Sequence, residues 1–178
     1  SFAFSDHEDG ESASEWYIYS NNPVEASVSS VSDSGRRSNV IYCDGTSTKN
    51  GFMIGDYWDT NPNDAEWNDT RRVLSFWYKG NFPSLEVYVT SSAGKHRVTY
   101  HCASGTNGYS NGWVHIYLGT GAGSTGWKRF ERDVKTDYET YATGNTWQST
   151  NGMIFWAGST LDYDLYLDDI RLSNCRTV

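Results

Sequence analysis

The sequence has no long apolar run, few prolines and no repeated segment. No stretch approaches the ~20 consecutive apolar residues that a membrane-spanning helix requires, so we expect no transmembrane segment and no membrane partner. Only 3 of the 178 residues are proline, and neither a Pro-rich linker nor a low-complexity tract divides the chain. These absences predict one domain over residues 1–174, followed by a short tail over residues 175–178.

Basic residues are outnumbered as well. The chain carries 14 Lys and Arg against 22 Asp and Glu, which gives a net charge of −8. Proteins that bind nucleic acid use a basic surface to displace the counterions of the phosphate backbone, and this chain has no basic surplus. We therefore expect no nucleic-acid partner.

Cysteine is scarce and odd in number. With three cysteines, Cys43, Cys102 and Cys175, at least one thiol stays unpaired within a monomer. Their spacing matches no zinc motif. Cys43 and Cys102 each lie on a predicted strand and would form a disulfide if those strands are neighbours, so the sequence leaves both states open.

Tyrosine and tryptophan, in contrast, are abundant: the chain has 13 Tyr and 8 Trp, and aromatic residues make up 16% of it. Together with many Gly, Ser, Thr and Asn residues, this composition is typical of secreted β-proteins. Apolar and polar residues alternate in about eleven segments, which turn-forming pairs such as Asn50-Gly51 and Asn111-Gly112 separate. We expect strands at Trp16–Ser20, Glu25–Val31, Ser38–Cys43, Gly51–Trp58, Arg72–Lys79, Ser84–Thr90, Arg97–Cys102, Trp113–Gly119, Trp127–Val134, Gly152–Trp156 and Asp164–Leu172, and one helical turn at Asp137–Ala142.

The order of these segments predicts the fold class. Sequential strands joined by short loops pair antiparallel, and two such sheets bury their inner faces against each other. The sequence therefore predicts an all-β fold, an antiparallel two-sheet β-sandwich of the jelly-roll type. The polar segment Asn61–Asp69 is expected to form a long surface loop.

Four consecutive predicted strands, between Arg72 and Gly119, share one pattern. Neighbouring side chains of a strand point to opposite faces, and one set in each of these strands is apolar and forms an inner face. The opposite set mixes rings with long polar side chains: Trp77, Lys79, Glu86, Tyr88, Arg97, Thr99, His101, Trp113, His115 and Tyr117. Sugars bind such a mixture, because their C–H faces stack on rings while their hydroxyls pair with polar groups. We interpret this outer face as a polysaccharide-binding surface.

Alternatives to this interpretation stay open. Trp77 or Trp113 would be structural if a loop covered it, and the loop aromatics Trp58, Trp67 and Tyr109 could form a site at the edge of the sandwich. The ligand is open too. The cationic side chains of the face favour an acidic glycan, whereas its rings fit a neutral β-glucan or xylan equally well.

Both ends of the chain carry short motifs. Phe4–Gly10 (FSDHEDG) is followed by Trp16, and Leu165–Leu172 reads LYLDDIRL. This pairing, with Ser34–Ile41 between, resembles the jelly-roll carbohydrate-binding modules of bacterial glycoside hydrolases and polysaccharide lyases. In those modules an acidic FEDG…W opening strand lies beside a hydrophobic-D-D-I-x-L closing strand. The resemblance covers most of the chain in layout, and this sequence departs from it at His7, where the family usually has an aromatic residue.

The resemblance implies a secreted module that binds polysaccharide without catalysis and targets the catalytic domain of a larger parent chain. Since the chain begins at Ser1 without a signal-like apolar run, we expect a processed form or a fragment. The resemblance also implies a structural calcium ion bridging the termini. Its ligands would include Glu8 and Asp169, with Asp6 or Asp33 and backbone carbonyls completing the ~6–8 oxygens that Ca²⁺ takes.

A catalytic role is the main alternative. Glycoside hydrolysis needs two facing carboxylates, and Glu86 is the one carboxylate that we place on the outer face, so we do not expect a hydrolase. A small β-sandwich polysaccharide lyase acting on a uronate glycan needs a cation, a base and an acid. The outer face would supply them from Arg97, Lys79, His101, His115, Tyr88 and Tyr117.

Overall fold

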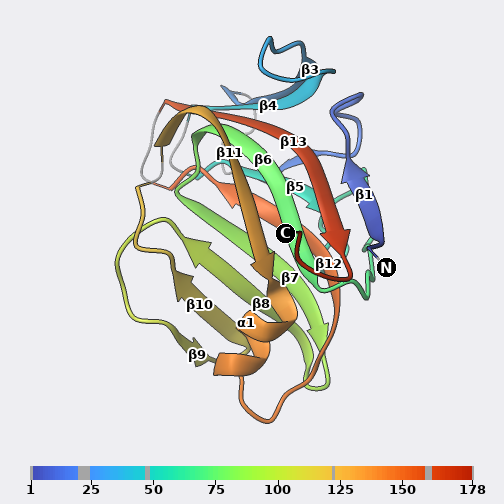
Figure 1. Cartoon of the computed structure of the whole chain (residues 1–178), viewed down its shortest axis with the longest axis vertical. Helices are drawn as coiled ribbons and strands as arrows, with labels where there is room; N and C mark the ends of the chain where they lie inside the picture. The colour runs from blue at the N-terminus through green and yellow to red at the C-terminus, as the bar shows by residue number, and fades with distance from the viewer. Residues whose placement is uncertain (1, 20–24, 47–48, 122, 159–161, 178) are drawn as a thin grey trace.

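The computed structural model describes residues 2–19, 25–46, 49–121, 123–158 and 162–177. They contain thirteen strands and one helix, and the strands form two sheets that pack face to face (Figure 1). Buried side chains from both sheets make one extended hydrophobic core. The all-β sandwich that the alternation predicts is therefore confirmed.

Sheet A joins the two ends of the chain. Its six strands follow the order β11-β6-β13-β4-β3, with β1 beside β13, and all of them pair antiparallel. The strands are β1 (Phe4–Glu8), β3 (Ser27–Val31), β4 (Val40–Gly45), β6 (Val73–Asn81), β11 (Gly123–Asp133) and β13 (Tyr163–Ser173). Because β1 lies against β13, the opening and closing motifs of the sequence are neighbours, as the resemblance implies (Figure 1).

Sheet B carries the candidate site. Its seven strands follow the order β2-β5-β12-β7-β8-β10-β9. They are β2 (Tyr17–Tyr19), β5 (Gly51–Gly55), β7 (Ser84–Ser91), β8 (Gly94–His101), β9 (Gly108–Ser110), β10 (Trp113–Tyr117) and β12 (Trp147–Trp156).

The expected antiparallel pairing is wrong at one place in sheet B, where β10 runs parallel to β8. After β8 the chain first forms β9 at the edge of the sheet and then turns back through Asn111 and Gly112, whose φ angles are 50° and 78°. A hairpin turn of this kind needs positive φ at both central residues. The returning strand β10 therefore lies between β9 and β8, in the same direction as β8.

The predicted inner face is confirmed by burial. Its core positions on β6, β7, β8 and β10 are at most 3% exposed: Leu74, Phe76, Leu85, Val87, Val89, Val98, Tyr100, Val114 and Ile116. Cys43 of β4 is buried in the same core, whereas Cys102 follows β8 of the other sheet. All three cysteines are free, so the possible Cys43–Cys102 disulfide does not form.

Helix α1 (Val134–Tyr141) covers the end of the sandwich next to β9 and β10 (Figure 1). The Asp133 carboxylate caps it by accepting a hydrogen bond of 3.0 Å from the backbone N–H of Thr136. The helical turn expected near this place is confirmed. No helix in the described ranges has the length and apolar character needed to cross a bilayer.

Candidate functional site

Three strands of sheet B bring most of the predicted site residues together. In the register of β7, β8 and β10, Tyr88, Arg97 and Trp113 form one row across the sheet. The next row contains Glu86, Thr99 and His115, and the third contains Ser84, His101 and Tyr117. We call the outer surface of sheet B, on which these side chains lie, the aromatic face.

Trp113 is held at one end of the aromatic face by two contacts. Its indole N–H donates a hydrogen bond of 2.7 Å to the hydroxyl of Thr99, and the guanidinium carbon of Arg97 lies 3.7 Å from its ring centroid. A guanidinium nitrogen of Arg97 is also 3.6 Å from a carboxylate oxygen of Glu86. The ring and the cation are therefore fixed relative to each other.

Three further rings lie beyond Trp113: His115 and Tyr117 on the same strand, β10, and His101 on the neighbouring strand, β8. His115 stacks on Trp113 with centroids 4.8 Å apart, and His101 stacks on Tyr117 at 4.4 Å. The two imidazoles meet between them, where Nε2 of His101 lies 2.9 Å from Nδ1 of His115. The two stacks and this hydrogen bond link the four rings into one continuous strip.

Burial keeps this pair of histidines neutral. It lowers the pKa of His101 below its ordinary value of 6.5, and the nearby His115 lowers it further. Burial also lowers the pKa of His115. At neutral pH the strip therefore presents uncharged imidazoles, which suit stacking against an apolar sugar face.

The aromatic face extends beyond the predicted residues toward the other edge of sheet B. Tyr88 donates a hydrogen bond of 2.9 Å to Glu86 and stacks on Tyr57, whose centroid is 4.3 Å away. Burial raises the pKa of Tyr57 to about 12, so its phenol stays protonated. A small hollow of about 180 Å³ opens here, lined by Tyr19, Met53, Tyr57, Trp58, Thr60, Glu86, Tyr88, Arg97 and Trp156.

The sequence prediction of the site did not include Trp156, Tyr19 or Tyr57. Trp156 lies at the end of β12 in register with Ser84, and Tyr19 of β2 meets it edge-on at 5.8 Å. Alternation along β12 does separate Trp156 from the core residue Phe155, so a signal for this ring was present. The strand predicted over Gly51–Trp58 includes Tyr57, but β5 ends at Gly55, and Tyr57 lies in the loop that follows it.

The three loop aromatics that were considered as an edge site lie in different parts of the molecule. Trp58 is 63% exposed and lies 4.3 Å from the ring centroid of Tyr57, so it adds to the aromatic face. Trp67 instead stacks on His7 at 4.0 Å, and Tyr109 lies beside His96. These three rings therefore do not form one site.

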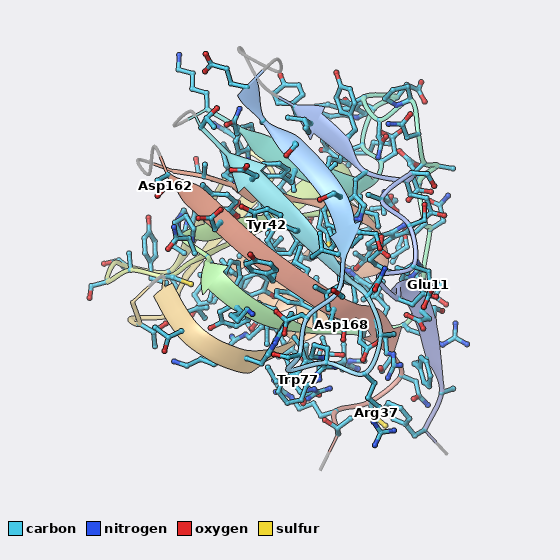
Figure 2. All side chains as sticks on the ribbon, turned by 90° about the horizontal axis from the view of Figure 1, so that it is seen from above. Glu11, Arg37, Tyr42, Trp77, Asp162 and Asp168 are labelled. Atoms are coloured by element: carbon cyan, nitrogen blue, oxygen red, sulfur yellow. The ribbon has the colours of Figure 1, made fainter. Side chains whose placement is uncertain are left out.

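Trp77 and Lys79 lie on the other sheet, so the expectation of one shared outer face is wrong for these two residues. Their strand β6 belongs to sheet A, between β11 and β13. The chain crosses from one sheet to the other in the two residues that separate β6 from β7. Figure 2 shows Trp77 on sheet A near Asp168, with the loop that carries Arg37 beside it.

That loop, between β3 and β4, covers Trp77. The guanidinium carbon of Arg36 lies 4.9 Å from the Trp77 ring centroid, and the Nε of Arg36 donates a hydrogen bond of 2.6 Å to Asp168. Lys79 pairs in the same way with Asp33 from the loop. Both predicted ligand-binding residues of β6 are thus engaged within the protein.

The four carboxylates expected to bind calcium already have partners within the protein. Glu8 is buried and accepts hydrogen bonds from the Trp16 indole (2.6 Å) and the Gly10 backbone (2.8 Å). Asp6 and Asp169 lie on either side of Arg171, at 3.9 and 3.6 Å. Asp33, on the outer face of sheet A, pairs with Lys79.

These side chains therefore do not fit a shared metal ion. A guanidinium already stands between Asp6 and Asp169, and it would repel a divalent cation. Across the described ranges, no group of three or more His, Cys, Asp or Glu side chains could hold a metal. Burial raises the pKa of Glu8 to about 7, and the hydrogen bonds from the Gly10 amide and the Trp16 indole oppose this shift by stabilising the carboxylate.

Comparison with known proteins identifies the fold. No family model matches the sequence, and no curated protein matches it. The family 11 carbohydrate-binding module of the cellulosomal cellulase Lic26A-Cel5E of Clostridium thermocellum is 18% identical, with a TM-score of 0.54 over 96% of this chain and 94% of that one. A family 11 module of the same species, in complex with a β-1,3-1,4-mixed-linked tetrasaccharide, gives 0.52 at 17% identity over 95% and 94%.

A third structure, the family 29 carbohydrate-binding module CBM29_1 from Piromyces equi, is 10% identical. Its TM-score is 0.50, and the match covers 98% of this chain and 92% of that one. At such low identities the similarity concerns the fold. This chain therefore has the β-sandwich fold found in carbohydrate-binding modules.

Proposed function

We propose that this chain binds a polysaccharide, without cleaving it, through the aromatic face of sheet B. The observation that carries the proposal is the continuous strip from Trp113 through His115 and His101 to Tyr117. Polar groups of Arg97 and Glu86 lie beside it. Rings for the C–H faces of a sugar and hydrogen-bonding groups for its hydroxyls are thus combined on one surface.

Besides the strip, which runs along β10, the face offers a second track for an extended glycan in a row that crosses the strands. Tyr19, Gly51, Trp156, Ser84, His101 and Tyr117 are in register on β2, β5, β12, β7, β8 and β10. Since neighbouring strands lie about 4.8 Å apart, this row spans roughly 24 Å. It is long enough for several sugar units, with aromatic rings at both ends.

The charges of the face favour a neutral glycan over an acidic one. Its cations are both paired: Arg97 lies against the Trp113 ring and beside the Glu86 carboxylate, and Lys95, near the Tyr57 ring, pairs with Glu66. Glu86 is buried near the middle of the face, where it would repel a uronate or a sulfate. The groups that a lyase needs are engaged as well, because His101 and His115 bond to each other.

In this role the chain would act as a secreted module that holds an attached glycoside hydrolase or lyase on its substrate. That part of the proposal is supported by the resemblance of its terminal motifs, whose strands β1 and β13 lie side by side.

Affinity gel electrophoresis tests the proposal. Wild-type protein is run through gels containing neutral β-glucans, xylan and galactomannan, and in parallel through gels containing alginate or pectin. We expect retardation in at least one neutral glycan and none in the uronates, and new carbon–carbon double bonds should not appear in the ultraviolet spectrum. Retardation in uronates alone, or release of unsaturated products, would contradict the proposal.

A further inference from the structure

A larger hollow opens on the opposite side of the sandwich, at the edge of sheet A. It measures about 540 Å³ and lies between the ends of β6 and β11. Its lining residues are Gly80, Asn81, Gly123, Ser124, Thr125, Gly126, Trp127 and Lys128. Sites for small ligands generally measure roughly 300–1,000 Å³, so this β11 hollow has the size of a binding site.

A bulge in the edge strand creates the β11 hollow. Ser124 is in register with Gly80, and Lys128 is in register with Tyr78. The three residues of β11 between Ser124 and Lys128 therefore stand opposite Lys79 alone. A bulge of this kind bends the strand and redirects its side chains. Here it turns the Trp127 ring over the outer face of sheet A.

Trp127 is fixed in place from the protein side. Its indole N–H donates a hydrogen bond of 3.0 Å to Asp33, and the Nζ of Lys79 lies 5.3 Å from its ring centroid. The backbone of Gly35 packs so closely that a Cβ there would come within 2.7 Å of the ring. The ring is already ordered, so a ligand that stacks on it loses little further side-chain entropy.

The chemistry of the β11 hollow suits a sugar. Trp127 supplies a ring, while Asn81, Ser124, Thr125 and Lys128 supply amide, hydroxyl and ammonium groups around it. Among the described residues that line the hollow, none is Asp or Glu. An aromatic platform with convergent hydrogen-bonding groups matches the hydroxyl-rich rim of a pyranose ring.

We propose that the β11 hollow is a second sugar-binding site, which takes one or two units of a polysaccharide chain. It shares no residue with the aromatic face, so it does not depend on the function proposed for sheet B. With sites on opposite sheets, one copy of the protein would hold two glycan segments at once and gain avidity on a polysaccharide surface.

NMR titration tests this site and the aromatic face separately. Uniformly ¹⁵N-labelled protein is titrated with hexasaccharides of mixed-linkage β-glucan, xylan and mannan while indole and backbone N–H signals are followed. We expect saturable shifts of the Trp127 indole and of the amides of Gly123–Lys128. These shifts should persist in Trp113→Ala and disappear in Trp127→Ala, whose affinity at this site should fall at least tenfold.

Each other outcome has a definite meaning. Shifts confined to Trp113, His115 and Tyr117 would overturn the second site and leave the aromatic face standing. Shifts confined to the β11 hollow would support the second site and count against the face. No shift at either place would overturn both. Because the wild-type titration alone distinguishes these results, the test stands even if Trp127→Ala does not fold.

Discussion

The outer faces of the two sheets use similar side chains in different arrangements. On sheet A, Arg36 and Lys79 lie against Trp77, Trp127 and Tyr166, but each cation is also paired with a carboxylate. On sheet B, four rings form an open strip with one paired cation at its end.

The difference shows that a ring needs an open approach to serve as a ligand platform: Trp77 lies beneath the loop between β3 and β4, whereas Trp127 of the same sheet lines the β11 hollow. What separates the two faces is where the partners of the rings come from. The loop between β3 and β4 brings Asp33 and Arg36 over sheet A, and Arg36 lies against Trp77, whereas Arg97 and Glu86 beside Trp113 belong to strands of sheet B itself. On sheet B, the loop after β8 packs the backbone of Gly105 against the Tyr117 ring, where an added Cβ would lie 2.3 Å from Cδ1.

The largest effect is expected on the free energy of unfolding, when a contact on the outer face of sheet A is removed. Arg36→Ala leaves Asp168, whose side chain is only 5% exposed, without its cation, and it uncovers Trp77. We expect the free energy of unfolding to fall by about 3 kcal/mol, as for a buried ion pair that loses one partner. Chemical denaturation measures it, with the exposed neighbour Arg37→Ala as the matched control. Equal losses in the two variants would contradict this reading of sheet A.

A somewhat smaller effect is expected on binding at sheet B. Trp113→Ala removes the ring that ends the strip and frees Arg97, so glycan affinity should fall by about 2 kcal/mol, or roughly thirtyfold. Trp113→Phe keeps a ring but loses the hydrogen bond to Thr99, and it should retain part of the affinity. Trp77→Ala should bind as the wild type does. Equal retardation of Trp113→Ala and Trp77→Ala in an affinity gel would contradict the difference between the faces.

A smaller effect should follow pH. The pKa values of His101 and His115 lie below 6.5 in the folded protein, so the unfolded chain takes up protons at these positions first. The stability that the neutral pair contributes is therefore complete above about pH 6.5 and is lost as the pH falls through that value toward the lowered pKa. Unfolding at a series of pH values should show a shallower slope for His115→Gln between about pH 7 and pH 5. If stability depended on pH equally in His115→Gln and the wild type, the neutral histidine pair would not be the cause.

The smallest effect is expected from a chelator. Because Glu8, Asp6, Asp169 and Asp33 already have partners within the protein, we expect the melting temperature to be the same with and without EDTA. A melting temperature that drops in EDTA and recovers on addition of Ca²⁺ would instead support the calcium ion that the terminal motifs imply.

Alternation in the sequence was sufficient to predict the strands and their inner faces. It works because each strand has one side in the core, so Leu85, Val87 and Val89 are recognisable without knowing their neighbours. Alternation did not predict strands β1 and β9, and β1 was expected from the resemblance of the opening motif alone. The five residues of β1 and the three of β9 are too short and polar for a clear period of two.

The assignment of strands to sheets was beyond reach of the same reasoning. Alternation tells which side chains of a strand share a face, but not which sheet the strand joins. The connection between β6 and β7 is short, and it nevertheless crosses the core from sheet A to sheet B. Trp77 and Lys79 were therefore grouped with Glu86 and Tyr88, although they lie on the opposite side of the protein.

The bulge in β11 has a further consequence for solubility. β11 is an edge strand of eleven residues, and the unpaired backbone groups of such a strand can template the addition of another chain. The irregular residues from Thr125 to Trp127 interrupt that edge, and the exposed charges of Lys128 and Arg129 follow directly. Shortening the bulge would straighten the edge and invite strand-to-strand aggregation, so the irregularity that shapes a hollow also keeps neighbouring copies apart.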